Sequence, residues 1–246
     1  MLVVGILTTA VATAAIPARA TYGAQVSVDE PQYLLTAISL GEDFDLDISD
    51  EIAAERFLPF HGLALNPQTM ELNASGQRLS PHDPLLPAVL AVPMRVGGWQ
   101  LAKATLALIA GILAALTLWV AVRRLDVGLI TASVTVAGFA ASPPLTTYGT
   151  QVYPEVPAAL ATMAAIAAIT GPMGNGALTV AAIAVVALPW LSIKYTLVAA
   201  ALAVTAVVRL YRDDATRQAL MLIGGLAVAG AVYLLFHRQV YGGWTV

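Results

Sequence analysis

Long apolar stretches with almost no charge constrain this chain more than any other feature. Residues 176–208 contain a single charged side chain, that of Lys194, and apolar residues also dominate residues 2–16 and 101–122. Hydrophobic residues make up 59% of the chain and charged residues 11%, whereas about a quarter of the residues of a soluble domain are charged. These stretches need the apolar surroundings of a bilayer, so we predict an integral membrane protein.

The membrane-spanning segments are expected to be α-helical. Ala, Val and Leu dominate them, without the alternation of apolar and polar residues that marks a membrane barrel. We predict an all-α membrane protein with about seven transmembrane helices, the first within residues 1–17. Six more are expected in residues 101–246, near 101–122, 127–142, 156–171, 176–190, 193–208 and 218–236.

The first apolar segment, residues 2–16, has a second interpretation. The Ala-rich sequence that follows Pro17, up to Ala24, resembles a signal-peptide cleavage site. The segment lacks the basic residues that normally precede the apolar part of a signal peptide. We therefore expect a retained first helix, with a cleaved signal peptide as the alternative.

Residues 18–100 form one long polar stretch. Nine of the fifteen acidic residues fall between Asp29 and Glu55, and ionised carboxylates are costly in hydrocarbon. We expect two helices here, near residues 30–41 and 84–96. The first has apolar residues at helical spacing and the second is too short to span, so both are predicted to lie at the membrane surface.

Two basic clusters indicate the orientation, because positive residues collect on the cytoplasmic side of a membrane. They consist of Arg123, Arg124, Arg209, Arg212 and Arg217. Both clusters are cytoplasmic only if residues 176–208 form two spans, broken near Pro189. This topology places residues 18–100 and a short tail from His237 outside. We expect a multi-pass plasma-membrane protein with its active face external.

Polar residues with candidate functions gather on this external side. Asp29 and Glu30 open the first short helix, where acids also stabilise a helix N-terminus without any catalytic role. Glu155 lies at a membrane boundary, where an acid is either a cap or functional. Lys194 lies near Trp190, and it either extends to the interface or holds a lipid phosphate. His82, just before the second short helix, is a further candidate.

Several functional classes are disfavoured. The net charge of −3 and the absence of a basic stripe argue against a nucleic-acid partner, and the absence of cysteine excludes thiolate chemistry. The acidic run Asp43–Asp47 departs from the EF-hand loop, because Ile48 and Ala54 occupy its glycine and bidentate glutamate positions. A solvated acidic face is the simpler interpretation, and we predict no metal site.

The order of these features resembles a known family. Residues 29–34 (DEPQYL), which lead into the acidic run, are similar to the first external loop of polyprenyl-phosphate-sugar-dependent glycosyltransferases of the C superfamily. Protein O-mannosyltransferases and lipid A aminoarabinose transferases belong to this group, and the likeness is greatest to actinobacterial members. It continues through the Pro-rich residues 81–96, the span that ends at 123–124, the element 153–157 and residues 189–190.

The resemblance implies transfer of a sugar, with inversion, from a polyprenyl-phosphate donor to an envelope glycan, lipid or protein, in cell-wall biogenesis. Asp29 is then the general base and Lys194 stabilises the leaving phosphate. Glu30 and Glu155 orient the acceptor or the base. The expected substrate-binding set also includes Tyr33, His82 and Trp190. The resemblance requires no cofactor, and a divalent metal is optional in the superfamily.

Other interpretations stay open. A transporter or flippase-like protein would carry ionisable residues in broken helices at mid-membrane, and a non-catalytic membrane subunit would keep the fold alone. Family members are usually much longer than this chain, which ends soon after the last expected span. A truncated member or a fragment is therefore a further interpretation.

Overall fold

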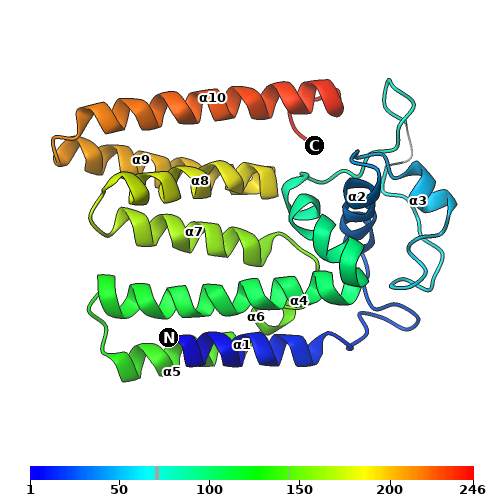
Figure 1. Cartoon of the computed structure of the whole chain (residues 1–246), viewed down its shortest axis with the longest axis horizontal. Helices are drawn as coiled ribbons and strands as arrows, with labels where there is room; N and C mark the ends of the chain where they lie inside the picture. Colours follow the sequence, from blue (N-terminus) through cyan, green and yellow to red (C-terminus); the bar gives the residue numbers. More distant parts are fainter. Residues whose placement is uncertain (70–71, 144) are drawn as a thin grey trace.

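The computed structural model describes residues 1–69, 72–143 and 145–246. Within these ranges the chain is all-helical, with isolated β-bridges in place of strands. Figure 1 shows the apolar helices side by side along the long axis, while α2 (Glu30–Glu42) and α3 (Ser49–Ala53) gather at one end. The molecule is therefore a helical bundle with a polar region at one end.

Three helical segments are long and apolar enough to cross a membrane. They are α4 (Leu85–Arg124), the 3₁₀ turn η1 (Ile193–Tyr195) continued by α9 (Thr196–Arg212), and α10 (Thr216–Val240). Four apolar helices are shorter, namely α1 (Leu2–Ala15), α5 (Leu129–Ala140), α7 (Glu155–Ile169) and α8 (Asn175–Leu191). A single turn, α6 (Leu145–Tyr148), lies between α5 and α7. An apolar helix lies at each of the seven expected positions, and three of these have the length that a membrane crossing needs.

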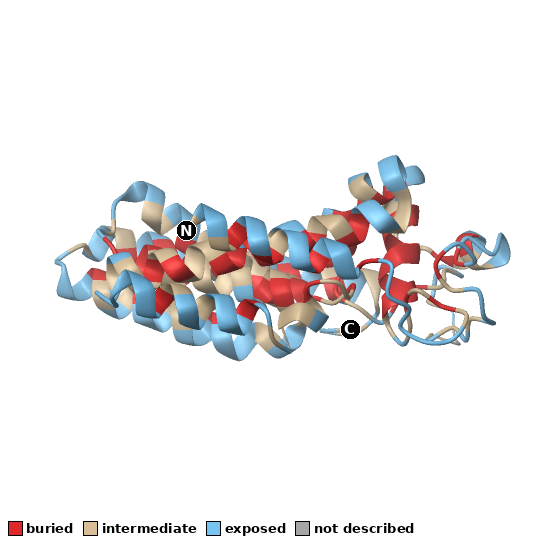
Figure 2. Cartoon of the chain, turned by 90° about the horizontal axis from the view of Figure 1, so that it is seen from below, coloured by how far each residue is buried: buried red, intermediate tan, exposed pale blue. Residues whose placement is uncertain are grey.

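The outer surface of the bundle is apolar. Figure 2 shows exposed residues along the outside of the helices, and many of them are large hydrophobic side chains. Ile130 on α5 is 81% exposed and Leu197 on α9 is 82% exposed. An apolar exterior of this extent is typical of a surface that contacts lipid. Together with the three long helices, it indicates a membrane-embedded protein.

Helix α4 is divided by a kink that the sequence located well. Gly97 and Gly98 have non-helical backbone angles, and Gly98 has a φ of 63° and a ψ of −162°, which only glycine adopts readily. The kink separates the two helices expected near 84–96 and 101–122. On the first arm, Val92 and Val96 face outward, so this arm has the apolar outer face expected of a membrane-surface helix.

Helix α2 forms where the sequence predicts a helix, but it is buried in the protein, whereas we expected it to lie exposed at the membrane surface. Eleven of its thirteen residues are buried. One side approaches α4 so closely that a Cβ on Gly41 would lie 2.9 Å from the carbonyl oxygen of Ala91. Phe57 and Phe60, from the loop after α3, share its apolar cluster. Loop residues thus cover the side of α2 that we expected to face water. The spacing of apolar residues within α2 gives no information about these loop contacts.

The apolar stretch 176–208 forms two helices, as predicted. The break lies at Ser192, which is extended (φ −170°, ψ 139°), and Pro189 stays inside the last turn of α8. The backbone N–H of Ile193 donates to Asp83 Oδ2 at 3.0 Å, so a carboxylate satisfies a donor exposed by the break. This contact stabilises the break at Ser192, whereas we expected it near Pro189.

The two basic clusters lie at the end of the bundle opposite α2 and α3, where α4 and α9 end and α10 begins (Figure 1). The terminal turns of α4 and α9 contain Arg123, Arg124, Arg209 and Arg212. Arg124 stacks on Trp119, with its Cζ 4.7 Å from the ring centroid. The polar region and the basic clusters thus occupy opposite ends, as the predicted topology requires.

Candidate functional site

Most of the residues singled out from the sequence gather at the polar end of the bundle. Tyr33 on α2 stacks on His82, with ring centroids 4.3 Å apart and an interplanar angle of 17°. Burial, then the negative charges of Asp29 and Glu155, raise the pKa of Tyr33. Asp29 and Lys194 also act electrostatically on His82. The structure therefore joins α2, the segment before α4, the start of α7 and η1 in one site.

Asp29 occupies the N-cap position of α2, but in the described residues its carboxylate makes no capping hydrogen bond. Its Oδ1 accepts a hydrogen bond from Gln68 Nε2 at 2.5 Å instead. The side chain is half-buried at the edge of the site. The helix does not use this carboxylate, which is therefore free to act on a ligand.

Gln68 links Asp29 to His82. His82 Nε2 lies 2.9 Å from Gln68 Oε1, and the Gln68 amide already donates to Asp29, so Nε2 is the protonated nitrogen of His82. Burial lowers the pKa of His82, which keeps the ring neutral at neutral pH. Gln68 stands in a long loop with no sequence signal, and sequence reasoning missed it.

Aromatic rings form one wall of the site. Tyr153 packs edge-on against Tyr33 at 6.4 Å, and Tyr148 packs edge-on against Tyr153 at 6.3 Å. Tyr33 itself is buried, while His82 and Tyr153 are partly exposed. The accessible faces thus belong to His82 and Tyr153, and Tyr33 supports them from beneath. Aromatic faces with a few fixed polar groups are typical of small-molecule sites.

Lys194 and Glu155 form an ion pair at the rim. Lys194 Nζ lies 2.7 Å from Glu155 Oε1, with side chains 56% and 29% exposed, and 5.2 Å from the centroid of the Tyr195 ring. Among the described residues, Glu155 Oε2 and the Tyr195 hydroxyl have no hydrogen-bond partner. Exposed ion pairs contribute little stability, so Lys194 can exchange Glu155 for an anionic ligand.

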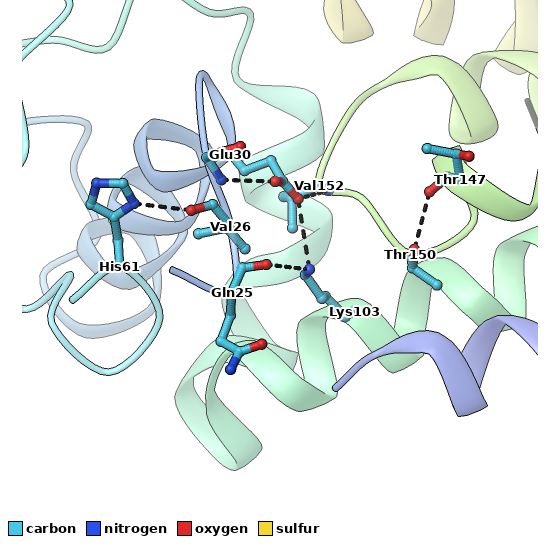
Figure 3. Close-up of polar contacts among 9 residues, drawn as sticks. Gln25, Val26, Glu30, His61, Lys103, Thr147, Thr150 and Val152 are labelled. Atoms are coloured by element: carbon cyan, nitrogen blue, oxygen red, sulfur yellow. Dashed lines mark hydrogen bonds and ion pairs between the residues drawn. The ribbon is translucent and has the colours of Figure 1, made fainter. Parts of the chain in front are cut away.

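Glu30 lies beneath the site and is almost wholly buried. Its Oε1 accepts the Val152 N–H at 2.8 Å and its Oε2 accepts the Ser27 N–H at 3.0 Å. Lys103 Nζ is 3.8 Å from Oε1 and donates to the Gln25 carbonyl at 3.1 Å. Figure 3 shows these contacts converging on Glu30. Both carboxylate oxygens are engaged, so Glu30 positions the backbone around Asp29.

Lys103 is a second residue that sequence reasoning missed. It lies inside an expected span, and a lone charge in an apolar helix is a signal of a buried partner or of function. Its charge also opposes the burial that raises the pKa of Glu30. The pair connects α2, α4 and the segment before α7.

Trp190 packs against α10. Its ring packs against Tyr233 at 5.2 Å and His237 at 5.7 Å. Both of these residues hydrogen-bond to Asp83 Oδ1, the Tyr233 hydroxyl at 2.9 Å and His237 Nε2 at 3.0 Å. Trp190 therefore belongs to the packing that holds the end of α10 against the segment before α4, and it also lines an apolar cavity among these helices.

An apolar cavity of 350 Å³ lies between α8, α9 and α10. Ile193 and Thr196, which flank the Lys194 turn, both line it. The cavity therefore begins at the turn that carries Lys194 and extends among apolar helices. This arrangement suits a ligand with an anionic head and an apolar tail.

Comparison of the chain with protein-family models, with curated proteins and with solved structures gives no match. Function is therefore inferred from the site itself. It combines a carboxylate not used by its helix, a cation on the rim, partly exposed aromatic faces and an adjacent apolar cavity. A carboxylate is the residue type of many general bases, and an ammonium group is a common ligand of phosphate.

Proposed function

We propose that this chain is a membrane glycosyltransferase that moves a sugar from a polyprenyl-phosphate donor to an acceptor hydroxyl outside the cytoplasm. The observation that carries the proposal is the state of Asp29. Its carboxylate is half-buried, is held by Gln68 and is not used to cap α2. The family resemblance of residues 29–34 assigns the base to the same residue.

In the proposed reaction, Asp29 removes the proton from the acceptor hydroxyl as its oxygen attacks the anomeric carbon of the donor sugar. The bond from that carbon to the phosphate oxygen breaks, and polyprenyl phosphate leaves with the bonding electrons. The base and the leaving group lie on opposite faces of the sugar, so the configuration inverts. Glu30 and Lys103 hold the backbone that carries Asp29 and act as positioning residues.

Lys194 is the proposed phosphate ligand. Its ion pair with Glu155 is short but partly exposed, and a phosphate with several acceptor oxygens competes well for an ammonium group. The adjacent apolar cavity accommodates the first part of the lipid tail. Stabilising the charge that develops on the leaving phosphate lowers the barrier.

The proposed topology has seven spans, with the site external. The basic ends of α4 and α9 lie opposite the polar end, which agrees with the positive-inside rule. The shorter helices α1, α5, α7 and α8 span together with their packing neighbours in a locally thinned bilayer. In the described part of the four shorter helices, the charged side chain is Glu155 at the start of α7, and Lys103 lies soon after the kink of α4, close to the polar end. Charges near one surface favour transfer there over transport.

The test uses the purified chain in lipid nanodiscs with polyprenyl-phosphate hexose or pentose, labelled in the sugar. We expect label to appear in an envelope-type glycan, lipid or peptide acceptor. Lys194→Gln should raise the KM for the donor, and Lys194→Arg should retain part of the affinity because it keeps the charge. Absence of transfer with both donor classes, or equal KM values in all three proteins, would contradict the proposal.

A further inference from the structure

Three carboxylates converge where the C-terminal end of α2 meets α3. One carboxylate oxygen from each of Asp43, Asp50 and Glu51 lies within 4.8 Å of the other two. Asp43 is the C-cap of α2, and Asp50 and Glu51 belong to the first turn of α3. Asp43 and Asp50 are exposed, so the cluster has a path to solvent.

Glu51 provides an independent sign of an absent ligand. It is 2% exposed, and its Oε2 has no hydrogen-bond partner among the residues that the structure describes. A buried polar atom without a partner is costly. The neighbouring cation, Arg56, does not fill this role, because it forms a two-bond ion pair with Glu42 at 2.9 and 2.7 Å. Glu51 thus places a buried carboxylate oxygen without a partner beside two further acids.

We propose that Asp43, Asp50 and Glu51 bind a divalent cation, and that Ca²⁺ is the ion that fits best. An all-oxygen donor set selects hard cations. Ca²⁺ accepts about six to eight oxygens in flexible geometry, whereas Mg²⁺ demands near-ideal octahedral geometry and is usually held by one or two carboxylates. Three carboxylates within 4.8 Å of one another can enter one Ca²⁺ coordination sphere, and water completes the shell on the exposed side.

This set differs from the EF-hand alignment that the sequence excludes. Asp47, central to that alignment, is already engaged: its Oδ1 accepts the Ser49 hydroxyl at 2.6 Å and the backbone N–H groups of Ser49 and Arg78. These bonds instead shape the loop that brings α3 to the end of α2. The ligands thus come from a helix end and a neighbouring helix, and the site is independent of the proposed transfer reaction.

A bound ion would tie α3 to α2 and stabilise the loop that covers α2.

The test is calorimetric titration of the full chain, stripped of metal in detergent, with CaCl₂ and separately with MgCl₂. We expect a Kd for Ca²⁺ of about 10⁻⁴–10⁻³ M, as in extracellular modules, and weaker binding of Mg²⁺. The Kd should rise at least tenfold in Glu51→Gln and in Asp50→Asn, the latter an exposed site that does not threaten folding. Glu55→Gln, an exposed acid of the same segment, is the matched control and should bind as the parent does.

Thermal unfolding provides a second readout on the same proteins. Ca²⁺ should raise the Tm of the parent and of Glu55→Gln, and leave that of Glu51→Gln unchanged. Absence of binding at millimolar Ca²⁺, or equal binding by Glu51→Gln and the parent, would overturn the proposal. Neither result depends on whether the chain transfers sugar.

Discussion

The carboxylate of Glu30 and the ammonium group of Lys103 lie 3.8 Å apart, and both side chains are almost wholly shielded from solvent. Glu30 also binds the N–H of Val152, 122 residues away in sequence. The pair thus joins α2, α4 and the segment before α7 directly beneath Asp29. It gives the proposed base a rigid support.

Breaking this pair should destabilise the protein. Glu30→Gln leaves Lys103 as an uncompensated buried charge and turns an amide donor toward a backbone N–H. We expect a loss of about 3–5 kcal/mol in the free energy of unfolding, measured by denaturant titration in detergent. Glu30→Gln combined with Lys103→Met should recover part of that loss. Equal stability of Glu30→Gln and the parent would show that the pair is not formed.

Gln68 should matter for activity rather than for stability. Gln68→Leu removes the hydrogen bonds to Asp29 and His82 at an exposed position. We expect kcat for sugar transfer to fall about tenfold, the equivalent of one charge-assisted hydrogen bond, with the Tm unchanged. Asn66→Leu, in the same loop, is the control and should keep full activity. A Gln68→Leu protein as active as the control would remove Gln68 from the mechanism.

The buried acid Glu51 should impose a pH dependence on stability when metal is absent. Its pKa is raised from the ordinary 4.5 to about 8, so between these values the folded state holds a proton that the unfolded state has lost. The free energy of unfolding should therefore decrease as pH rises through this window. Glu51→Gln should flatten the curve and be more stable at the alkaline end, by about 1–3 kcal/mol. Parallel curves measured in EDTA would contradict the assignment.

The proposed topology can be tested with single cysteines, because the chain has none of its own. Ser75, Asn175 and Thr216 are exposed, and cysteine at each should leave the fold intact. An impermeant thiol reagent applied to intact cells should label position 75 directly and the other two only after permeabilisation. Labelling of positions 175 and 216 on opposite sides would mean that residues 176–208 cross the membrane once.

The helices of this protein are largely predictable from its sequence, because long apolar runs and their charged ends depend on local composition. The kink at Gly97 and Gly98 and the break after α8 were both anticipated to within a few residues. The burial of α2 was not, because the side chains that cover it come from the loop after α3. The spacing of apolar residues in α2 predicts the face that packs against α4, but it does not predict that loop residues cover the opposite face.

The site was predictable only in part. Asp29, Glu155 and Lys194 stand out because a charge at the edge of an apolar helix is rare, and the structure brings them together. Gln68 lies in a loop without pattern, and its link to Asp29 spans 39 residues. Trp190 precedes Lys194 closely in sequence, but the structure turns it toward α10, where it lines the apolar cavity instead of the polar part of the site. Such contacts depend on tertiary packing.

The most direct test of the central claim is the rate of sugar transfer by Asp29→Asn relative to the parent. The substitution keeps the shape of the side chain and removes the base. The Asp29 carboxylate makes no capping bond within the described chain, so the Tm should not change, and Asp29→Ala should be as stable as Asp29→Asn. We expect kcat to fall by about 10²–10⁴-fold in both variants. Transfer by Asp29→Asn at the parent rate would contradict the mechanism, and a stability loss confined to Asp29→Ala would assign Asp29 to the helix end instead.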